Sequence, residues 1–188
     1  MNTHFPIHGI TTERLTLQAA HPSHAHALQT YQLRNRVFLK PWEPARDDDF
    51  FELEAISQRL ETMAEKTANG EALHLLILRD GTLIGACNFT NIVRGAFEAC
   101  HLGYALDESA QGQGLMHEAL KAAIAYVFEA MKLHRIMANY RPENERSARL
   151  LKRLGFEREG EARAYLKING VWADHVLTSL INSADHAS

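Results

Sequence analysis

The chain contains 188 residues, 46% of them hydrophobic, and carries a formal net charge of −3 at pH 7. This length suits one domain, so we expect a single domain over residues 1–188 with its core between about 12 and 180. The lack of a basic excess argues against a protein that coats nucleic acid, and no apolar run approaches the ~18 residues needed to span a membrane. Because the N-terminus also lacks a signal-peptide pattern, the cytoplasm is the expected compartment.

Cysteine and histidine usage gives no sign of a metal site. Cys87 and Cys100 stand in apolar, strand-like segments, and no Cys-x-x-Cys pair is present. His21, His24 and His26 lie close in sequence, but residues two apart face different sides of a helix. We therefore expect neither a metal site nor a disulfide.

The first part of the chain predicts one strand and two helices. Residues 14–18 alternate apolar and polar side chains, which is typical of a strand buried on one face. Ser23 is the expected N-cap of a first helix that ends near Arg36. A second helix should run from Asp49 to about Gly70, because its apolar residues recur at intervals of three and four.

Residues 38–46, between these two helices, should form a shaped loop. Pro41 and Pro44 prevent regular helix there, and Trp42 stands beside Glu43. The tryptophan can anchor the loop on the core, or the two side chains can line a pocket, and both interpretations stay open.

Antiparallel strands come next. The apolar runs 73–78 and 83–89 flank Asp80-Gly81, which is a strong hairpin signal. A further strand is expected over 99–106. These segments predict the antiparallel part of a sheet.

A turn with two glycines joins strand 99–106 to an amphipathic helix expected over 115–131. Glycine lets a phosphate approach the backbone closely, and the unpaired N–H groups of a first helical turn attract the anion. Gly112 and Gly114 therefore indicate a site for a phosphate-bearing ligand, although a plain structural turn fits them equally well. Their spacing differs from the G-x-G-x-x-G of dinucleotide sites.

A strand over 134–140 follows, and strand, helix and strand in this order predict a parallel crossover. Asn144 should cap a short helix that ends at Gly155. Two closing strands, 165–168 and 171–180, should form a hairpin around a type I′ Asn-Gly turn. The predicted class is α+β, with a mixed, mostly antiparallel sheet of about seven strands and about four helices.

Two motifs at this point resemble the cofactor signatures of the GNAT acetyltransferases. Residues 111–116 read Gln-Gly-Gln-Gly-Leu-Met, where the family pattern is Gln or Arg, two residues, Gly, one residue, then Gly or Ala. Met116 departs from that pattern. Residues 144–156 begin with Asn-Glu-Arg-Ser and are similar to the second signature. The resemblance implies the GNAT fold, with a splay between the two parallel strands.

Over residues 12–178 the chain resembles the RimJ and RimL group, especially RimJ. The segments that carry the similarity are 38–44, 94–95, 102–104, 111–116, 134–140 and 174–178. The resemblance implies an N-acetyltransferase that transfers acetyl from acetyl-CoA to the N-terminal alanine of a small-subunit ribosomal protein. It also implies association with the ribosome, no membrane partner, no nucleic-acid specificity, and a monomer or homodimer.

The resemblance implies where acetyl-CoA binds. Its pyrophosphate should lie on the backbone of the glycine turn, and its pantetheine in the gap beside the end of strand 99–106. The implied cofactor residues are Leu106, Gln111, Gly112, Gln113, Gly114, Leu115, Met116, Asn144 and Ser147.

The acid and base positions of many relatives are changed here. Their tyrosine acid corresponds to Leu151, and the glutamate base of some corresponds to Asn139. By resemblance to RimL-like proteins, Ser147 protonates or hydrogen-bonds the thiolate, while a merely structural role in its helix is the alternative.

Three carboxylates are candidates for the base, namely Glu43, Glu98 and Asp174, although an α-amine with a pKa near 8 does not strictly need one. Glu98 shares strand parity with Leu106, but it can also be an exposed strand-end residue. Asp174 and His175 face opposite sides of their strand, and Asp174 is favoured. The predicted catalytic residues are Ser147 and Glu98, and the predicted acceptor-binding residues are Trp42, Glu43 and Asp174.

Two alternatives stay open. The chain can acetylate a small amine, such as a polyamine, an aminoglycoside or an amino acid. It can also be a non-catalytic acetyl-CoA-binding module that docks on ribosomes, a reading favoured by the changed acid and base positions.

Overall fold

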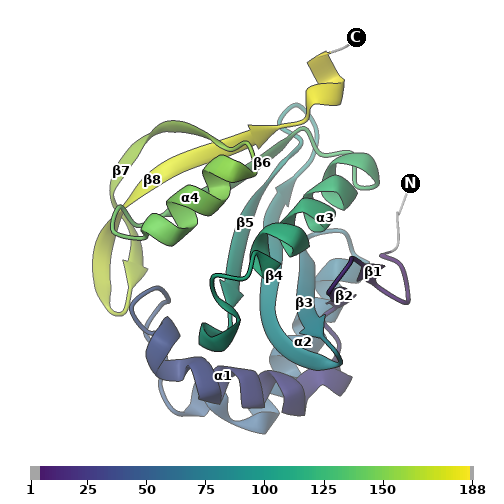
Figure 1. The fold of residues 1–188 in the computed structure, drawn as a ribbon, viewed down its shortest axis with the longest axis vertical. Helices are drawn as coiled ribbons and strands as arrows, with labels where there is room; N and C mark the ends of the chain where they lie inside the picture. The colour runs from purple at the N-terminus through teal and green to yellow at the C-terminus, as the bar shows by residue number, and fades with distance from the viewer. Residues whose placement is uncertain (1–4, 187–188) are drawn as a thin grey trace.

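The computed structural model describes residues 5–186, which form one mixed sheet of eight strands with helices on both faces (Figure 1). The strands are β1 (Ile10–Thr11), β2 (Thr16–Ala19), β3 (Leu73–Arg79), β4 (Thr82–Val93), β5 (Ala99–Leu106), β6 (Arg135–Tyr140), β7 (Glu157–Ile168) and β8 (Val171–Ile181). The α-helices are α1 (Ala25–Leu39), α2 (Leu53–Ala68), α3 (Leu115–Glu129) and α4 (Glu145–Arg153). The predicted fold class is confirmed, and the additional strand is the two-residue β1.

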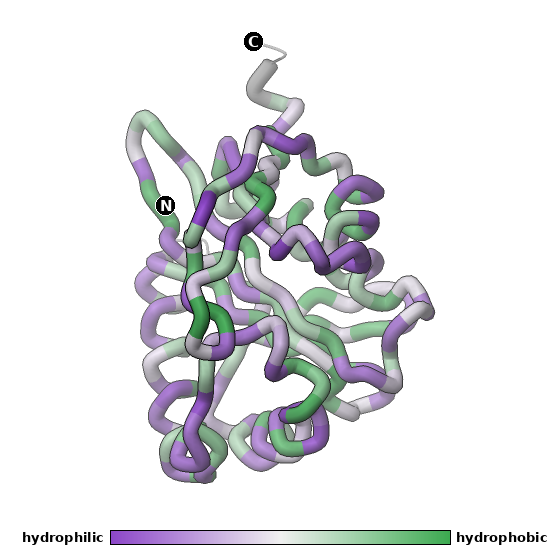
Figure 2. The backbone as a smooth tube through the Cα atoms, turned by 90° about the vertical axis from the view of Figure 1, so that its left-hand side faces the viewer, coloured by the Kyte–Doolittle hydropathy of each residue, from purple (hydrophilic) through white to green (hydrophobic). Residues whose placement is uncertain are grey.

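The sheet separates two hydrophobic cores. Strand β3 shows the division, because Leu75 packs in the core with α3 and α4 whereas Leu76 packs with α1 and α2. In Figure 2 the hydrophobic stretches gather in the strands, while the helices alternate hydrophobic and hydrophilic residues. Each helix therefore buries one face against the sheet.

Both predicted hairpin turns are present. Asp80 and Gly81 have φ of 50° and 76°, and Asn169 and Gly170 have φ of 44° and 83°. Two successive residues with positive φ are the requirement of a type I′ turn. Strand β7 begins eight residues before its predicted start at Tyr165, because this edge strand is mostly exposed and its polar residues give no apolar alternation.

Helix α1 differs from the prediction at both ends. A 3-10 turn over Pro22–His24 precedes it, and the N–H of Ser23 donates to Nδ1 of His21, so Ser23 is not its N-cap. The helix also continues past Arg36 to Leu39. It stops just ahead of Pro41, because Lys40 still donates its N–H to the carbonyl of Arg36 whereas proline has no N–H to continue the helix.

The predicted parallel crossover is confirmed, and its two strands separate at one end. β5 and β6 pair from Ala99 with Arg135 to His101 with Met137. Beyond that point β5 still pairs with β4, and β6 still pairs with β8. The last residues of β5 and β6 therefore border a gap in the sheet. No helix among the described residues is long and apolar enough to cross a membrane.

Candidate active site

A cavity of about 980 Å³ lies at the gap between β5 and β6. Its walls are the end of α1 with the loop that follows, the end of β5, the glycine turn with the first turn of α3, and α4. Residues distant in sequence are therefore brought to one place.

The glycine turn presents uncapped backbone to this cavity. Gly114 is the N-cap of α3, has a φ of 75°, and as a glycine offers no side chain to cap the first turn of the helix. The N–H groups of that turn therefore point toward a ligand with the helix dipole behind them. Arg14 braces the turn, because its Nη1 donates to the carbonyl of Gln113 at 2.9 Å and its Nε to Glu118 at 2.7 Å.

Two predicted cofactor residues in this turn also have structural contacts. Gln111 donates through Nε2 to the carbonyl of Leu106 at 3.0 Å, which ties the turn to the end of β5. Met116 is only 7% exposed and belongs to the core beneath α3. Its departure from the family pattern therefore does not crowd the turn.

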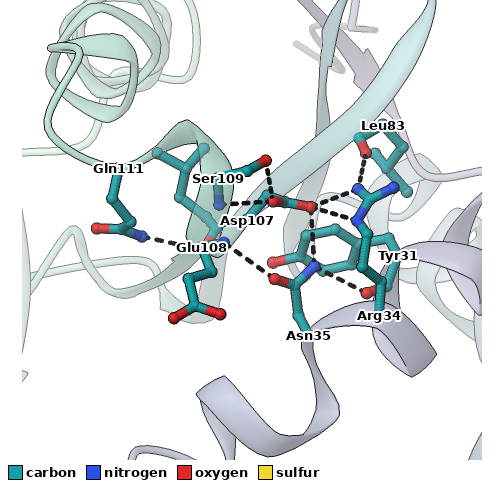
Figure 3. Close-up of polar contacts among 9 residues, drawn as sticks. Tyr31, Arg34, Asn35, Leu83, Asp107, Glu108, Ser109 and Gln111 are labelled. Atoms are coloured by element: carbon teal, nitrogen blue, oxygen red, sulfur yellow. Dashed lines mark hydrogen bonds and ion pairs between the residues drawn. The ribbon is translucent and has the colours of Figure 1, made fainter.

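The carboxylate of Asp107 lies between α1 and the turn that leads into α3 (Figure 3). It accepts hydrogen bonds from Arg34 Nε at 2.6 Å, from Asn35 Nδ2 at 3.0 Å, and from the N–H and hydroxyl of Ser109. Burial alone would raise the pKa of Asp107, but these hydrogen bonds outweigh it and lower the pKa to about 2. The network fixes the glycine turn relative to α1.

Sequence reasoning missed this network. The available signal was Asn35, a polar residue one turn after Tyr31 on the buried side of α1. A buried asparagine needs partners for its amide, and here they are the Tyr31 carbonyl, Asp107 and the N–H of Glu108.

Ser147 lies at the start of α4, where two contacts define its role. Its N–H donates to Oδ1 of Asn144 at 3.1 Å, which confirms the predicted cap. Its hydroxyl oxygen accepts from the hydroxyl of Tyr104 at 3.0 Å. Because Ser147 accepts from Tyr104, its own O–H proton is left for a group in the cavity.

Tyr104 is a functional residue that the sequence did not single out for chemistry. It belongs to β5, lines the cavity, and faces the same side of the sheet as Leu106. Burial raises the pKa of Tyr104 to about 12, so it keeps its proton at neutral pH and can donate it in the hydrogen bond to Ser147.

The loop after α1 brings the predicted acceptor residues Trp42 and Glu43 to the cavity wall. Trp42 is 38% exposed, so it does not anchor the loop in a core. Burial raises the pKa of Glu43, and the charge of Arg46 offsets this in part. The Glu43 carbonyl accepts from the N–H of Asn169 at 2.8 Å, so the β7–β8 turn holds the loop in place.

Glu98 is not brought to the cavity, and its predicted role as a base is wrong. It precedes β5 at the end opposite Leu106, roughly 25 Å away along an extended strand. Its carboxylate pairs with Arg94 at 3.1 Å and accepts from the N–H of Gly95. Strand parity gave the correct face but could not give the position along the strand.

Asp174 is also outside the cavity lining, and so is His175, so neither residue of this pair faces the cavity as predicted. Its Oδ1 accepts from the N–H of Ala164 at 2.7 Å, within an irregular stretch of the β7–β8 pair. His175 is the buried one of the two, with its ring 5.6 Å from that of Tyr165. Asp174 supports the hairpin rather than the acceptor.

The arrangement fits a ligand with several phosphates and a linear arm. The α3 N-terminus offers backbone donors, and Arg146, Arg149 and Arg153 add positive charge to the α4 wall of the cavity. The gap between β5 and β6 offers unpaired strand edges to amide groups. Among residues 5–186, no group of three or more His, Cys, Asp or Glu residues could hold a metal ion.

Comparison with known proteins shows the family of this chain. The model of the acetyltransferase (GNAT) domain matches residues 14–157. The chain belongs to the GNAT acetyltransferase family. The prediction of an acetyl-CoA-dependent N-acetyltransferase is therefore confirmed.

Individual GNAT relatives are similar over nearly the whole chain. The [ribosomal protein uS5]-alanine N-acetyltransferase of Escherichia coli is 47% identical over 91% of this chain and 89% of its own. The ribosomal-protein-S5-alanine acetyltransferase of Vibrio fischeri superposes with a TM-score of 0.89 and 42% identity, covering 93% of this chain and 96% of that one. Mycobacterium smegmatis RimJ, in complex with CoA-disulfide, superposes with a TM-score of 0.87 and 29% identity, covering 90% of this chain and 83% of that one.

Proposed function

We propose that this chain transfers the acetyl group of acetyl-CoA directly to the α-amino group of an N-terminal alanine, or a similarly small residue, on a small-subunit ribosomal protein. The observation that carries the proposal is one cavity with two different ends. The α3 end offers phosphate-binding backbone, and the α1 loop end offers Trp42 and a partly buried carboxylate, Glu43. The names of the E. coli and V. fischeri relatives support the acceptor.

On the cofactor side, the backbone from Gln113 to Met116 binds the pyrophosphate, and the end of β5 near Leu106 hydrogen-bonds the pantetheine arm. Asn144 serves this site indirectly by capping α4, which places Ser147 beside Tyr104. The glycine turn needs no rearrangement to bind, because Arg14 and the Asp107 network already hold it.

On the acceptor side, Glu43 receives a proton from the amine, directly or through water. The amine nitrogen bonds to the thioester carbon, the carbon–sulfur bond breaks, and the sulfur leaves with the electron pair. The Ser147 O–H donates a hydrogen bond to the leaving thiolate, and Tyr104 orients Ser147. The thiolate then takes up a proton from water, and Glu43 releases to water the proton that it received from the amine. The alternative of a purely structural Ser147 is disfavoured, since its cap contact uses the backbone N–H and leaves the hydroxyl for the cavity.

The proposal places the chain in the cytoplasm as a single domain, acting on the ribosomal protein as a monomer or a homodimer. Its partner is the acceptor's N-terminus, with association to the ribosome during or after assembly. The proposed activity involves neither a membrane nor the recognition of a specific nucleic-acid sequence.

Thiol release from acetyl-CoA tests the proposal. Purified protein is incubated with peptides that begin with Ala, with the same peptides blocked at the α-amine, and with polyamines, aminoglycosides and amino acids. We expect turnover of the free Ala peptides only. Turnover of small amines alone would favour a small-molecule acetyltransferase, and no turnover of any amine would favour a binding module.

Two variants test the role of the Ser147 hydroxyl. Ser147→Ala should lower kcat at least tenfold with little change in the KM for acetyl-CoA, and Tyr104→Phe should lower kcat less. Wild-type kcat in Ser147→Ala would reject the catalytic role of that hydroxyl.

A further inference from the structure

A second hollow, here called the outer pocket, lies on the other side of the α1 loop and has a volume of about 380 Å³. Its lining combines aliphatic side chains with two cations and one amide, namely Val37, Pro41, Ile168, Val171, Lys40, Arg141 and Asn169. Val37 is 85% and Val171 69% exposed, which is unusual for aliphatic residues that lie close together.

The outer pocket shares a wall with the active-site cavity. Arg141 donates through Nη1 to the carbonyl of Pro41 at 3.0 Å, and its guanidinium lies 5.9 Å from the ring of Trp42. The N–H of Asn169, in the lining of the outer pocket, donates to the carbonyl of Glu43, in the lining of the cavity. One loop therefore faces the acceptor amine on one side and the outer pocket on the other.

The charge of the outer pocket is positive. No carboxylate contributes to its lining, and Lys40 has no ion pair among the described residues. Arg141 is paired with Glu143 outside the lining, but that contact is 3.4 Å long and leaves Nε without a hydrogen bond within the described chain. The pocket thus offers positive charge and donors next to an aliphatic surface.

We propose that the outer pocket binds the second to fourth residues of the acceptor chain and selects an acidic side chain beside an aliphatic one. The inference rests on the proposed function, since it takes the acceptor to be a protein N-terminus. Asn169 of the pocket lining is hydrogen-bonded to the backbone of Glu43, and an extended peptide advances about 3.3 Å per residue, so we assign the pocket to the residues that follow the acceptor amine around the edge of the α1 loop. The acidic side chain meets Lys40 and Arg141, and the aliphatic one meets Val37 and Val171.

Peptides that begin with Ala and differ only at positions two to four test this inference. One set carries a glutamate beside a leucine there, a second carries a lysine beside a leucine, and a third carries a glutamate beside a serine. For the wild type we expect kcat/KM to be about two- to fivefold higher for the first set than for the second, which is the effect of one ion pair at a partly exposed site. Replacing leucine by serine should also lower kcat/KM.

Lys40→Glu should reverse the order of the glutamate and lysine peptides. Lys121→Glu is the matched control, because it makes the same charge change on an exposed position of α3 that lines neither hollow. It should keep the wild-type order. Equal kcat/KM for the glutamate and lysine sets, or an unchanged order in Lys40→Glu, would refute the selection of an acidic residue by the outer pocket. Either result would leave the proposed function intact. Failure to turn over any Ala peptide would overturn the proposed function and this inference with it.

Discussion

Replacing Asp107 by Asn should destabilise the protein strongly at neutral pH and much less in acid. Asp107 is 2% exposed and accepts from Arg34, Asn35 and Ser109. Asparagine keeps the shape of the side chain but removes its charge and turns an NH2 group toward these donors. Arg34 then loses its anionic partner at the base of the glycine turn.

The magnitude follows from the pKa. Holding the pKa of Asp107 at about 2 instead of 3.8 stabilises the fold by about 2.5 kcal/mol at pH 7. Because the folded pKa lies below the unfolded one, this contribution is complete above about pH 5 and is lost as the pH falls through about 2. By pH 3 about 1 kcal/mol of it should be gone.

Urea unfolding of wild type and Asp107→Asn, at pH 7 and at pH 3, measures the difference in the free energy of unfolding. Asp48→Asn is the control, since Asp48 also pairs with an arginine but is 84% exposed, and it should cost less than about 1 kcal/mol at either pH. The gap between wild type and Asp107→Asn should shrink by about 1 kcal/mol at pH 3. A gap that is small at pH 7, or equal at both pH values, would refute the reasoning.

Three further variants test the site. Burial raises the pKa of Glu43 above 4.5, so the slope of log kcat/KM against pH should steepen from one, set by the amine, to two below that raised pKa. Glu43→Gln should remove the steeper part of the profile. The same slope in both proteins would exclude Glu43 as the base. Gly114→Ala places a side chain at a φ of 75°, so it should lower the free energy of unfolding in urea by about 1 kcal/mol and raise the KM for acetyl-CoA. An unchanged KM would show that the turn does not bind the cofactor. The Tyr31 hydroxyl is buried with no hydrogen-bond partner in the described structure, so Tyr31→Phe should leave stability unchanged or raise it by up to about 1 kcal/mol; a clear loss would reveal a partner.

Features set by neighbouring residues were predictable. Asp80-Gly81 and Asn169-Gly170 fix their own turns, since few other residue pairs adopt positive φ twice in succession. Asn144 caps α4 through a bond to a residue three positions on. The order of strand, glycine turn, helix and strand likewise predicted the crossover and the glycine turn that forms one wall of the cavity.

Contacts between distant residues were not predictable. Tyr104 and Ser147 are 43 positions apart, and Asn35 and Asp107 are 72 apart, so no local pattern links them. The same limit explains the errors at Glu98 and Asp174. Alternation along a strand tells which face a side chain takes, but the packing of other elements decides whether a cavity lies against that face.

Intact-mass spectrometry of ribosomal proteins, from cells with and without this protein, tests the proposed acceptor most directly. The expected result is that one small-subunit protein with an N-terminal alanine or similarly small residue becomes lighter by the mass of a single acetyl group when the protein is missing, and regains it when the wild type, but not Ser147→Ala, is restored. Identical masses for every ribosomal protein in the two cell types would contradict the proposed function.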